Sequence, residues 1–197
     1  GEWVLRTACA QAQAWRQAGL PFGRIAVNIA GPQLQREGLS DTVRAVLNET
    51  GLPPACLELE ITETLVMRQV ERTIDWLQAL QALGVMLAID DFGTGYSSLA
   101  YLKRLPVDKL KIDRSFVRDL PGDENDAAIA RAVIALGHSM HLTVIAEGVE
   151  TVVQRDFLRE SGCDQVQGFL YSRPLPAVEA EAFLRAAAVS RAPVEVV

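Results

Sequence analysis

Residues 85–96 have the sequence VMLAIDDFGTGY, in which an apolar run leads into two adjacent aspartates and a glycine-rich turn. The apolar run, residues 85–89, is typical of a buried strand, and the glycines after it end the extended geometry. Asp90 and Asp91 repel each other, and each resists ionisation beside the other unless a cation holds them. A divalent metal ion is therefore one expected partner. The alternative is structural, with Asp91 capping the following turn and Asp90 solvated.

The composition describes a globular chain with an acidic balance of charge. Its 197 residues, 49% of them hydrophobic, fit one domain with a sizeable core. The net charge of −6 excludes a basic surface for a long nucleic acid, although a small phosphate ligand could bind beside a metal ion. No apolar run approaches the roughly 20 residues that span a bilayer, and the first residues do not read as a secretion signal. We therefore expect a soluble domain in the cytoplasm, or at the cytoplasmic face of a membrane if an upstream segment anchors the protein.

Strands and helices are expected to alternate along the chain. Strands are predicted over residues 24–29, 57–61, 85–89, 110–113, 143–146 and 165–169. Helices are predicted over residues 2–18, 40–50, 68–83, 97–105, 123–140, 151–160 and 177–187, with Gly19 ending the first and Ser40 and Ser97 as N-caps. A helix between successive apolar strands indicates a parallel sheet covered on both faces, either a doubly wound sheet or a (β/α) barrel.

Two of these helices have a readable apolar pattern. The first carries Val4, Ala8 and Trp15 on one stripe, with Leu5, Cys9 and Ala12 beside it. The helix over residues 123–140 carries Ile129, Val133, Leu136 and Met140 on one face.

Each predicted strand has a polar residue at or just past its C-terminal end. These residues are Asn28, Glu60, Asp90 with Asp91, Lys111 with Asp113, Glu147, and Gln167. In a (β/α) barrel the strand ends converge on one mouth, where active sites lie, whereas an open sheet spreads them along an edge. Any one of them alone could be a turn or cap residue, but the recurrence at every strand favours a shared site. We therefore expect an α/β fold of the TIM-like (β/α)-barrel class.

The expected site is rich in oxygen ligands and lacks histidine. His138 and His141 lie on and just after a helix and are expected to be surface or packing residues, and Cys9, Cys56 and Cys163 to be plain thiols. Carboxylates with an amide oxygen suit Mg²⁺ or Mn²⁺ rather than zinc, and an Asp pair can bridge two such ions. Two bridged ions stabilise the attacking and leaving oxygens in phosphoester hydrolysis. Lys111 fits beside them as a cation that orients water or neutralises developing charge.

Six stretches of the sequence resemble the EAL domain, the family of cyclic di-GMP phosphodiesterases. They are VNI (27–29), ELEITE (58–63), DDFGTGYSSL (90–99), KLKID (109–113), AEGVE (146–150) and QGFLYSRPLP (167–176). The resemblance extends from residue 1 to about residue 184. It implies hydrolysis of cyclic di-GMP to the linear dinucleotide 5′-pGpG in bacterial second-messenger signalling. It also implies two Mg²⁺ or Mn²⁺ ions with Ca²⁺ inhibitory, a homodimer, and upstream sensory or diguanylate-cyclase-like domains.

The resemblance also implies a role for individual residues. Asn28, Glu60 and Asp90 would bind one metal ion, and Asp90 with Asp91 the other. Glu147 and Lys111 would hold or activate the attacking water, supported by Asp113 and Gln167. Glu63 and Glu150 would anchor the loop over residues 92–98, which in the family lies near the dimer contact and gates metal binding. The residues implied to contact the substrate are Phe92, Gly93, Tyr171 and Pro174.

The sequence departs from the family pattern at its start. No strand bearing a Glu-Ala-Leu motif precedes Gly1, so six of eight barrel strands are expected here, without one metal-binding Glu. We expect an N-terminally incomplete EAL-like domain over residues 1–187 and a tail over 188–197. Such a piece alone is expected to be poorly active and prone to associate through exposed sheet edges. Phe169 and Tyr171 stand in the reverse of the usual order, which stacking tolerates because either ring presents a π-face.

A second function remains open from the sequence. The chain could be a catalytically impaired EAL-like receptor for cyclic di-GMP, or a dimerisation or scaffold module. Impaired members lose the Asp pair, the lysine or the loop glycines, and this sequence keeps all of them. The enzyme interpretation is therefore favoured.

Overall fold

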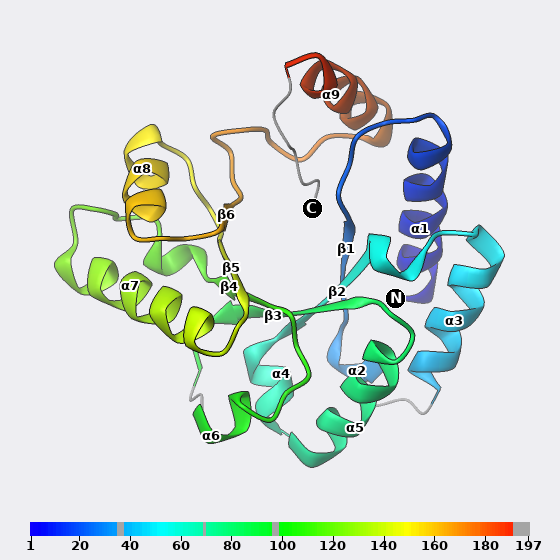
Figure 1. Cartoon of the computed structure of the whole chain (residues 1–197), viewed down its shortest axis with the longest axis horizontal. Coiled ribbons are helices and arrows are strands. Elements are labelled where there is room, and N and C mark those ends of the chain that lie inside the picture. The colour runs from blue at the N-terminus through cyan, green and yellow to red at the C-terminus, as the bar shows by residue number, and fades with distance from the viewer. Residues whose placement is uncertain (35–37, 69, 96–98, 191–197) are drawn as a thin grey trace. The chain divides into compact units, whose positions relative to one another are not determined.

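The protein alternates parallel strands with helices, as the sequence predicts (Figure 1). The computed structural model describes residues 1–34, 38–68, 70–95 and 99–190. The strands are β1 (Ile25–Asn28), β2 (Leu57–Thr62), β3 (Met86–Phe92), β4 (Lys109–Ile112), β5 (Thr143–Ala146) and β6 (Gln165–Val166). The α-helices are α1 (Glu2–Gln17), α2 (Gly31–Leu34), α3 (Leu39–Thr50), α4 (Glu63–Arg68), α5 (Val70–Gln81), α6 (Leu99–Leu102), α7 (Glu124–Ser139), α8 (Val152–Glu160) and α9 (Ala177–Ser190). Two short 3₁₀ helices, η1 (Pro54–Cys56) and η2 (Arg114–Phe116), precede β2 and follow β4.

The strands follow the order of the chain, β1-β2-β3-β4-β5-β6. β1 pairs with β2, and β3, β4, β5 and β6 pair in succession, all in parallel. In the register of β4 and β5, Lys111 lies opposite Ile145, and in that of β1 and β2, Asn28 lies opposite Glu60. Parallel neighbours connected through helices bring their C-terminal ends to the same edge, which is where the sequence places its polar residues.

The chain divides into two compact units. The first contains Gly1–Glu60, Asp75–Met86 and Pro174–Val197, and the second contains Ile61–Ile74 and Leu87–Arg173. In the first unit, α1 packs against α3 and β1 (Figure 1), and the side chains of Trp15, Leu20, Ala180 and Leu184 form a buried cluster. In the second unit, α7 packs against β4, β5 and η2. Each unit therefore has a core of its own.

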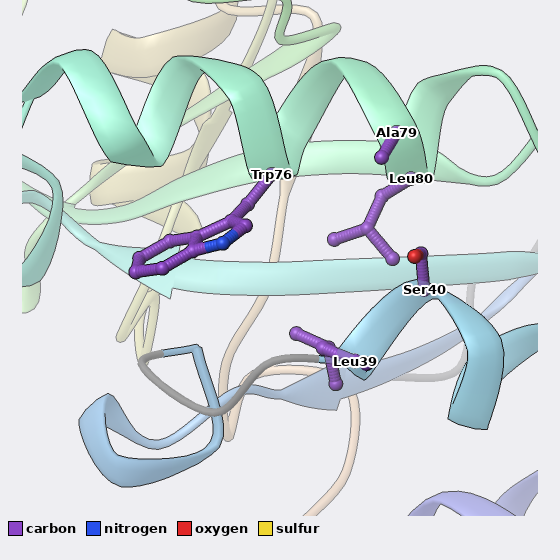
Figure 2. Close-up of a pocket in the computed structure, with 6 residues that line it drawn as sticks. Leu39, Ser40, Trp76, Ala79 and Leu80 are labelled. Carbon is purple, nitrogen blue, oxygen red and sulfur yellow. The ribbon is translucent and has the colours of Figure 1, made fainter.

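The first unit also contains a small cavity between the start of α3 and the second half of α5. Figure 2 shows Leu39 and Ser40 of α3 on one side and Trp76, Ala79 and Leu80 of α5 on the other. Its volume is about 30 Å³, the space that one water molecule occupies in the liquid. The cavity is a packing gap and is too small for an organic ligand.

The start of α3 corrects one prediction. Ser40 is not the N-cap, because the helix already begins at Leu39 and is preceded by Gly38 in the left-handed conformation, with φ of 92°. Leu39 is buried at the first helical position. Packing of this residue, rather than a cap formed by Ser40, therefore sets where the helix begins. Gly19 does follow α1 with φ of 70°, as predicted for a helix C-terminus.

The buried faces of α1 and α7 also differ from the predicted ones. α1 buries Leu5, Cys9, Ala12 and Trp15, whereas Val4 is 47% exposed. α7 buries mainly small residues, namely Ala127, Ala130, Val133, Ile134 and Gly137, whereas Ile129 is exposed. A Cβ atom at Gly137 would overlap Cγ2 of Val144 on β5, so at this position the helix lies too close to the sheet for any side chain. The inner face of α7 therefore includes Val133 from the predicted face but is centred on Ala130, Ile134 and Gly137.

Several element boundaries differ from those predicted. β3 continues through both aspartates to Phe92, and β6 ends at Val166. α4 begins at Glu63, whereas the predicted helix begins only at residue 68. The predicted cap Ser97 lies outside the described residues, and so do residues 96–98 of the predicted loop and 191–197 of the predicted tail. α9 continues to Ser190, beyond the predicted helix end at residue 187. Among the described residues, no helix is both long and apolar enough to cross a bilayer.

The N-cap of α7 provides a test of the local structure. Asp123 accepts hydrogen bonds from the backbone N–H groups of Asn125 (2.8 Å) and Asp126 (3.0 Å). We expect Asp123→Ala to lower the free energy of unfolding by about 1 kcal/mol in urea denaturation. Ser40→Ala is the control and should change it by less than about 0.5 kcal/mol, since Ser40 is not a cap. Equal losses in both variants would contradict the assignment of the two helix starts.

Candidate functional site

A buried lysine joins two carboxylates where β3, β4 and β5 end. Lys111 Nζ lies 3.1 Å from Asp90 Oδ1 and 2.6 Å from Glu147 Oε1. The lysine side chain is 3% exposed, so both ion pairs are shielded from water. Burying an unpaired ammonium group costs several kcal/mol, and the two carboxylates offset that cost.

Asp91 adds a third carboxylate to this cluster through an unusual backbone conformation. Its φ is 54°, in the left-handed region, and its backbone N–H donates to Asp90 Oδ1 at 3.0 Å. The pairing of β3 with β4 is irregular between Ile89 and Phe92, which spans both aspartates. As a result, one oxygen from each of Asp90, Asp91 and Glu147 lies within 4.8 Å of the others. Successive residues of a regular strand point to opposite faces, so this bend is what brings both aspartates to one site.

The electrostatics of the cluster favour a bound cation. Burial raises the pKa of Asp91, and the charges of Asp90 and Asp113 and a hydrogen bond with Asp113 raise it further, while Lys111 opposes the shift. Burial also acts to raise the pKa of Asp113, but hydrogen bonds from the hydroxyl and backbone N–H of Ser115 outweigh it and leave the pKa of Asp113 lowered. The single positive charge of Lys111 therefore does not neutralise the carboxylates of Asp90, Asp91 and Glu147. Clustered carboxylate oxygens are the donor set of Mg²⁺ or Mn²⁺, so these residues fit such an ion.

The turn after Asp91 is held by Glu63, the first residue of α4. The backbone N–H of Gly93 donates to Glu63 Oε2 at 2.8 Å, and Glu63 is 1% exposed. A Cβ atom at Gly93 would lie 2.8 Å from Cε2 of Phe116, and one at Gly95 would lie 2.7 Å from Glu63 Oε1. Gly93, with φ of 100°, is thus required for the turn, whereas a side chain at Gly95 would displace the Glu63 carboxylate. Glu63 contacts the predicted loop at Gly93, and its functional role as an anchor stays a prediction.

The loop that carries Glu147 is joined to the segment after β6. The backbone N–H of Val149 donates to the Gln167 carbonyl at 2.9 Å, and that of Leu170 donates to the Val149 carbonyl at 3.0 Å. The side-chain Oε1 of Gln167 is buried and has no hydrogen-bond partner within the described ranges. Gln167 therefore lies on a segment fixed to the Glu147 loop, with an oxygen available for a ligand or water. Glu150 is exposed, and its role as an anchor of the loop over residues 92–98 stays a prediction.

The other predicted site residues are placed as follows. Asn28 is exposed at the end of β1, and Glu60, opposite it in register, is 1% exposed within β2, which continues to Thr62. Phe92 is buried with 4% exposure, whereas Tyr171 is 51% exposed and Pro174 is exposed. The metal-binding role of Asn28 and Glu60 stays a prediction. The substrate contacts of Phe92, Tyr171 and Pro174 also stay predictions.

Two further residues carry interactions that sequence reasoning missed. Gln154 on α8 is 5% exposed and its side chain makes three hydrogen bonds. The pattern Thr151-x-x-Gln154, a capping box, is a signal that could have marked it. The guanidinium of Arg173 lies 4.6 Å from the centre of the Phe169 ring.

His138 and Cys9 are predicted to lie outside the site. His138 is exposed, and its Nε2 lies 3.0 Å from Asp164 Oδ2. Burial raises the pKa of the Cys9 thiol to about 11, as befits an unreactive cysteine.

Known proteins similar to this chain share one domain type. The family model described as "EAL domain" matches residues 1–174. The cyclic di-GMP phosphodiesterase NbdA of Pseudomonas aeruginosa is 52% identical over 192 residues, which are 98% of this chain and 24% of NbdA. The bifunctional diguanylate cyclase/cyclic di-GMP phosphodiesterase MucR of the same species is 50% identical over 90% of this chain and 26% of its own length. The chain thus spans about a quarter of the length of these curated relatives.

Solved structures agree with this result. The MucR phosphodiesterase in complex with c-di-GMP superposes with a TM-score of 0.88 at 49% identity, covering 91% of this chain and 73% of that one. The calcium/cy-diGMP complex of Klebsiella pneumoniae BlrP1 gives a TM-score of 0.80 at 33% identity, covering 88% of this chain and 43% of that one. The predicted α/β fold of the TIM-like barrel class, with six strands in this chain, is confirmed.

The raised pKa of Asp91 predicts a pH-dependent effect on stability. An acid whose pKa is higher in the folded state than in the unfolded state is destabilising once it ionises, and this cost is absent below the unfolded pKa of about 3.9. In excess chelator, Asp91→Asn should therefore raise the free energy of unfolding at pH 7, and the difference should vanish as the pH falls below about 4. Asn also tolerates the left-handed backbone at this position.

Urea denaturation across this pH range measures the effect. Asp75→Asn, at an exposed position on α5, is the control for loss of a negative charge and should show no comparable pH-dependent gain. Unchanged or lowered stability of Asp91→Asn at pH 7 would show that repulsion within the cluster is not significant.

Proposed function

This chain belongs to the EAL domain family, and we propose that it hydrolyses one phosphodiester of cyclic di-GMP to give linear 5′-pGpG with two Mg²⁺ or Mn²⁺ ions. The observation that carries the proposal is the buried cluster of Lys111 with Asp90, Asp91 and Glu147. A receptor that only binds the dinucleotide needs neither a buried lysine between two carboxylates nor a third carboxylate beside them. The phosphodiesterase names of NbdA and MucR point in the same direction.

Glu147 and Lys111 are assigned to the attacking water. The water oxygen forms a bond to phosphorus while the bond from phosphorus to the ribose 3′ oxygen breaks, and the leaving oxygen gains a proton. Glu147 Oε1 lies 2.6 Å from Lys111 Nζ, and its carboxylate can accept the proton lost by water. Lys111 stays protonated between its two carboxylates and orients the water while offsetting negative charge at phosphorus. Asp113 and Gln167 support these two residues.

The proposed metal ligands follow the family assignment. Asn28, Glu60 and Asp90 hold one ion, and Asp90 with Asp91 holds the other; bound ions stabilise the attacking and leaving oxygens. We propose that Ca²⁺ inhibits, because its larger and looser coordination does not keep two ions at the spacing that the reaction requires. The BlrP1 structure contains calcium together with cy-diGMP.

The remaining assignments concern the wider protein. Glu63 and Glu150 anchor the turn after β3, and Phe92, Gly93, Tyr171 and Pro174 contact the substrate. We propose an EAL domain from residue 1 through the end of α9 at Ser190, acting in the cytoplasm as a homodimer. MucR, which combines two activities in its name, supports further domains such as a diguanylate-cyclase-like or sensory domain in the same protein.

Metal dependence is the direct test of the proposed reaction. We expect the domain with the N-terminal strands of the family present to convert cyclic di-GMP to 5′-pGpG with Mg²⁺ or Mn²⁺, and expect excess chelator to abolish turnover. Replacing the ion with Ca²⁺ should also abolish turnover while cyclic di-GMP still binds, as judged by calorimetry. Full turnover in excess chelator would reject the two-metal mechanism, and binding without turnover under every metal would favour the receptor.

Lys111→Ala separates chemistry from folding. Loss of a single electrostatic donor at a transition state costs on the order of 10²-fold or more in kcat, and we expect a loss of that size per folded molecule. KM for cyclic di-GMP should change much less, because the assigned substrate contacts lie on other residues. Lys103→Ala, at an exposed position just after α6, is the matched control and should keep the wild-type rate. If Lys111→Ala lowers only the melting temperature, Lys111 is a structural residue.

A further inference from the structure

Gln154 uses its side chain for three hydrogen bonds in the interior of the second unit. Its carboxamide oxygen accepts from the backbone N–H groups of Glu150 (2.8 Å) and Thr151 (2.9 Å). Its carboxamide nitrogen donates to the carbonyl oxygen of Arg118 at 2.8 Å. The residue is 5% exposed. Gln154 thus links the loop that precedes α8 to the turn that follows η2.

Capping of α8 does not account for all of these bonds. A capping box needs one bond from the cap side chain to the third helical N–H and one bond back to the N-cap N–H. Thr151 and Gln154 make both, and a Glu at position 154 would serve equally well. The bond to Arg118, 36 residues away, requires a donor that a carboxylate lacks. The position therefore calls for an amide rather than for any capping residue.

The two segments that Gln154 joins carry groups of the functional site. The loop before α8 begins at Glu147, whose Oε1 lies 2.6 Å from Lys111 Nζ. The turn that contains Arg118 follows η2, whose N-cap is Asp113. Gly148, with φ of 69°, lies so close to η2 that a Cβ atom there would be 2.6 Å from Cβ of Arg114. The loop is thus packed against η2 at its start and hydrogen-bonded to the turn beyond η2 at its end.

We propose that Gln154 is a positioning residue for hydrolysis, which holds the Glu147 loop at a fixed distance from the segment that carries Asp113. This inference rests on the proposed function, because Glu147 is the residue that it places against the attacking water. Gln154 acts through the backbone and does not touch the substrate. Outer residues that orient a catalytic or metal-binding group typically contribute 10–100-fold to activity or metal affinity, and we expect an effect at the lower end of that range.

Gln154→Glu tests the proposal because it changes one bond and nearly no volume. The new side chain keeps the oxygen that accepts from Glu150 and Thr151, but it places a second oxygen against the Arg118 carbonyl. When this carboxyl group is ionised the two oxygens repel, and when it is protonated its O–H can donate to the carbonyl. We therefore expect the ratio of variant to wild-type kcat to fall about tenfold at high pH and to recover toward one as the pH is lowered. KM should change less than kcat.

The control is Gln78→Glu, which adds the same charge at an exposed position on α5. Its ratio of kcat to the wild type should be constant with pH. The ion pairs near Gln154, Arg118 with Asp119 and Arg155 with Asp156, are present in both proteins, so their titration cancels in the ratio. A ratio for Gln154→Glu that is flat with pH, or that follows only the fraction of folded protein, overturns the proposal.

Amide hydrogen exchange provides a readout that does not depend on turnover. In Gln154→Leu, the backbone amides of Glu150 and Thr151 lose their acceptor and should exchange at least about tenfold faster, whereas those of α7 should be unchanged. Unchanged exchange at these two amides overturns the proposal. If Gln154→Leu does not fold, the same measurement on Gln154→Glu at high and low pH replaces it. Absence of hydrolysis in the wild type rejects the proposed function itself, and is thereby distinguished from a failure of the positioning role.

Discussion

The structure around the candidate site depends on one buried cation. Lys111 lies between Asp90 and Glu147 with 3% of its side chain exposed, so its charge is balanced by protein groups rather than by water. Asp90 lies on β3, Lys111 on β4, and Glu147 directly follows β5, so the balance holds only when β3, β4 and β5 keep their parallel register. Loss of one partner leaves an uncompensated buried charge, which costs several kcal/mol. The same contacts that organise the site therefore also fix the register of these strands.

The strands and the polar residues at their ends could be predicted because both depend on the composition of short stretches of sequence. The apolar residues before Asp90 and the segment around Ile145 each predict a strand from their own composition. Lys111 and Glu147 then meet because parallel strands joined by helices bring their C-terminal ends together. The family resemblance predicted the barrel class, and the match of the family model to residues 1–174 confirmed the family. The individual roles of the site residues remain proposals.

The features that could not be predicted depend on contacts between distant segments. The inner face of α7 includes Gly137, packed against Val144, and Ile134, rather than the predicted Ile129. Ser40 resembles a helix cap, but the burial of Leu39 places the helix start before it. Gln154 has a local capping signal, whereas its bond to Arg118 appears only when both segments are folded. A short stretch of sequence predicts only local geometry. The inner face of α7, the start of α3 and the bond of Gln154 to Arg118 depend on contacts between distant segments.

The bend at Asp91 has a consequence for how this strand can change during evolution. Because Asp91 has φ of 54° and the pairing is irregular beside it, two consecutive residues contribute to one site. A site of this kind tolerates no insertion or deletion between Ile89 and Phe92, since a shift of one position would turn a carboxylate toward the opposite face of the sheet. Point substitutions elsewhere in the strand leave this geometry intact. Length variation in homologous chains should accordingly accumulate in the connecting loops, while this short segment keeps a constant number of residues.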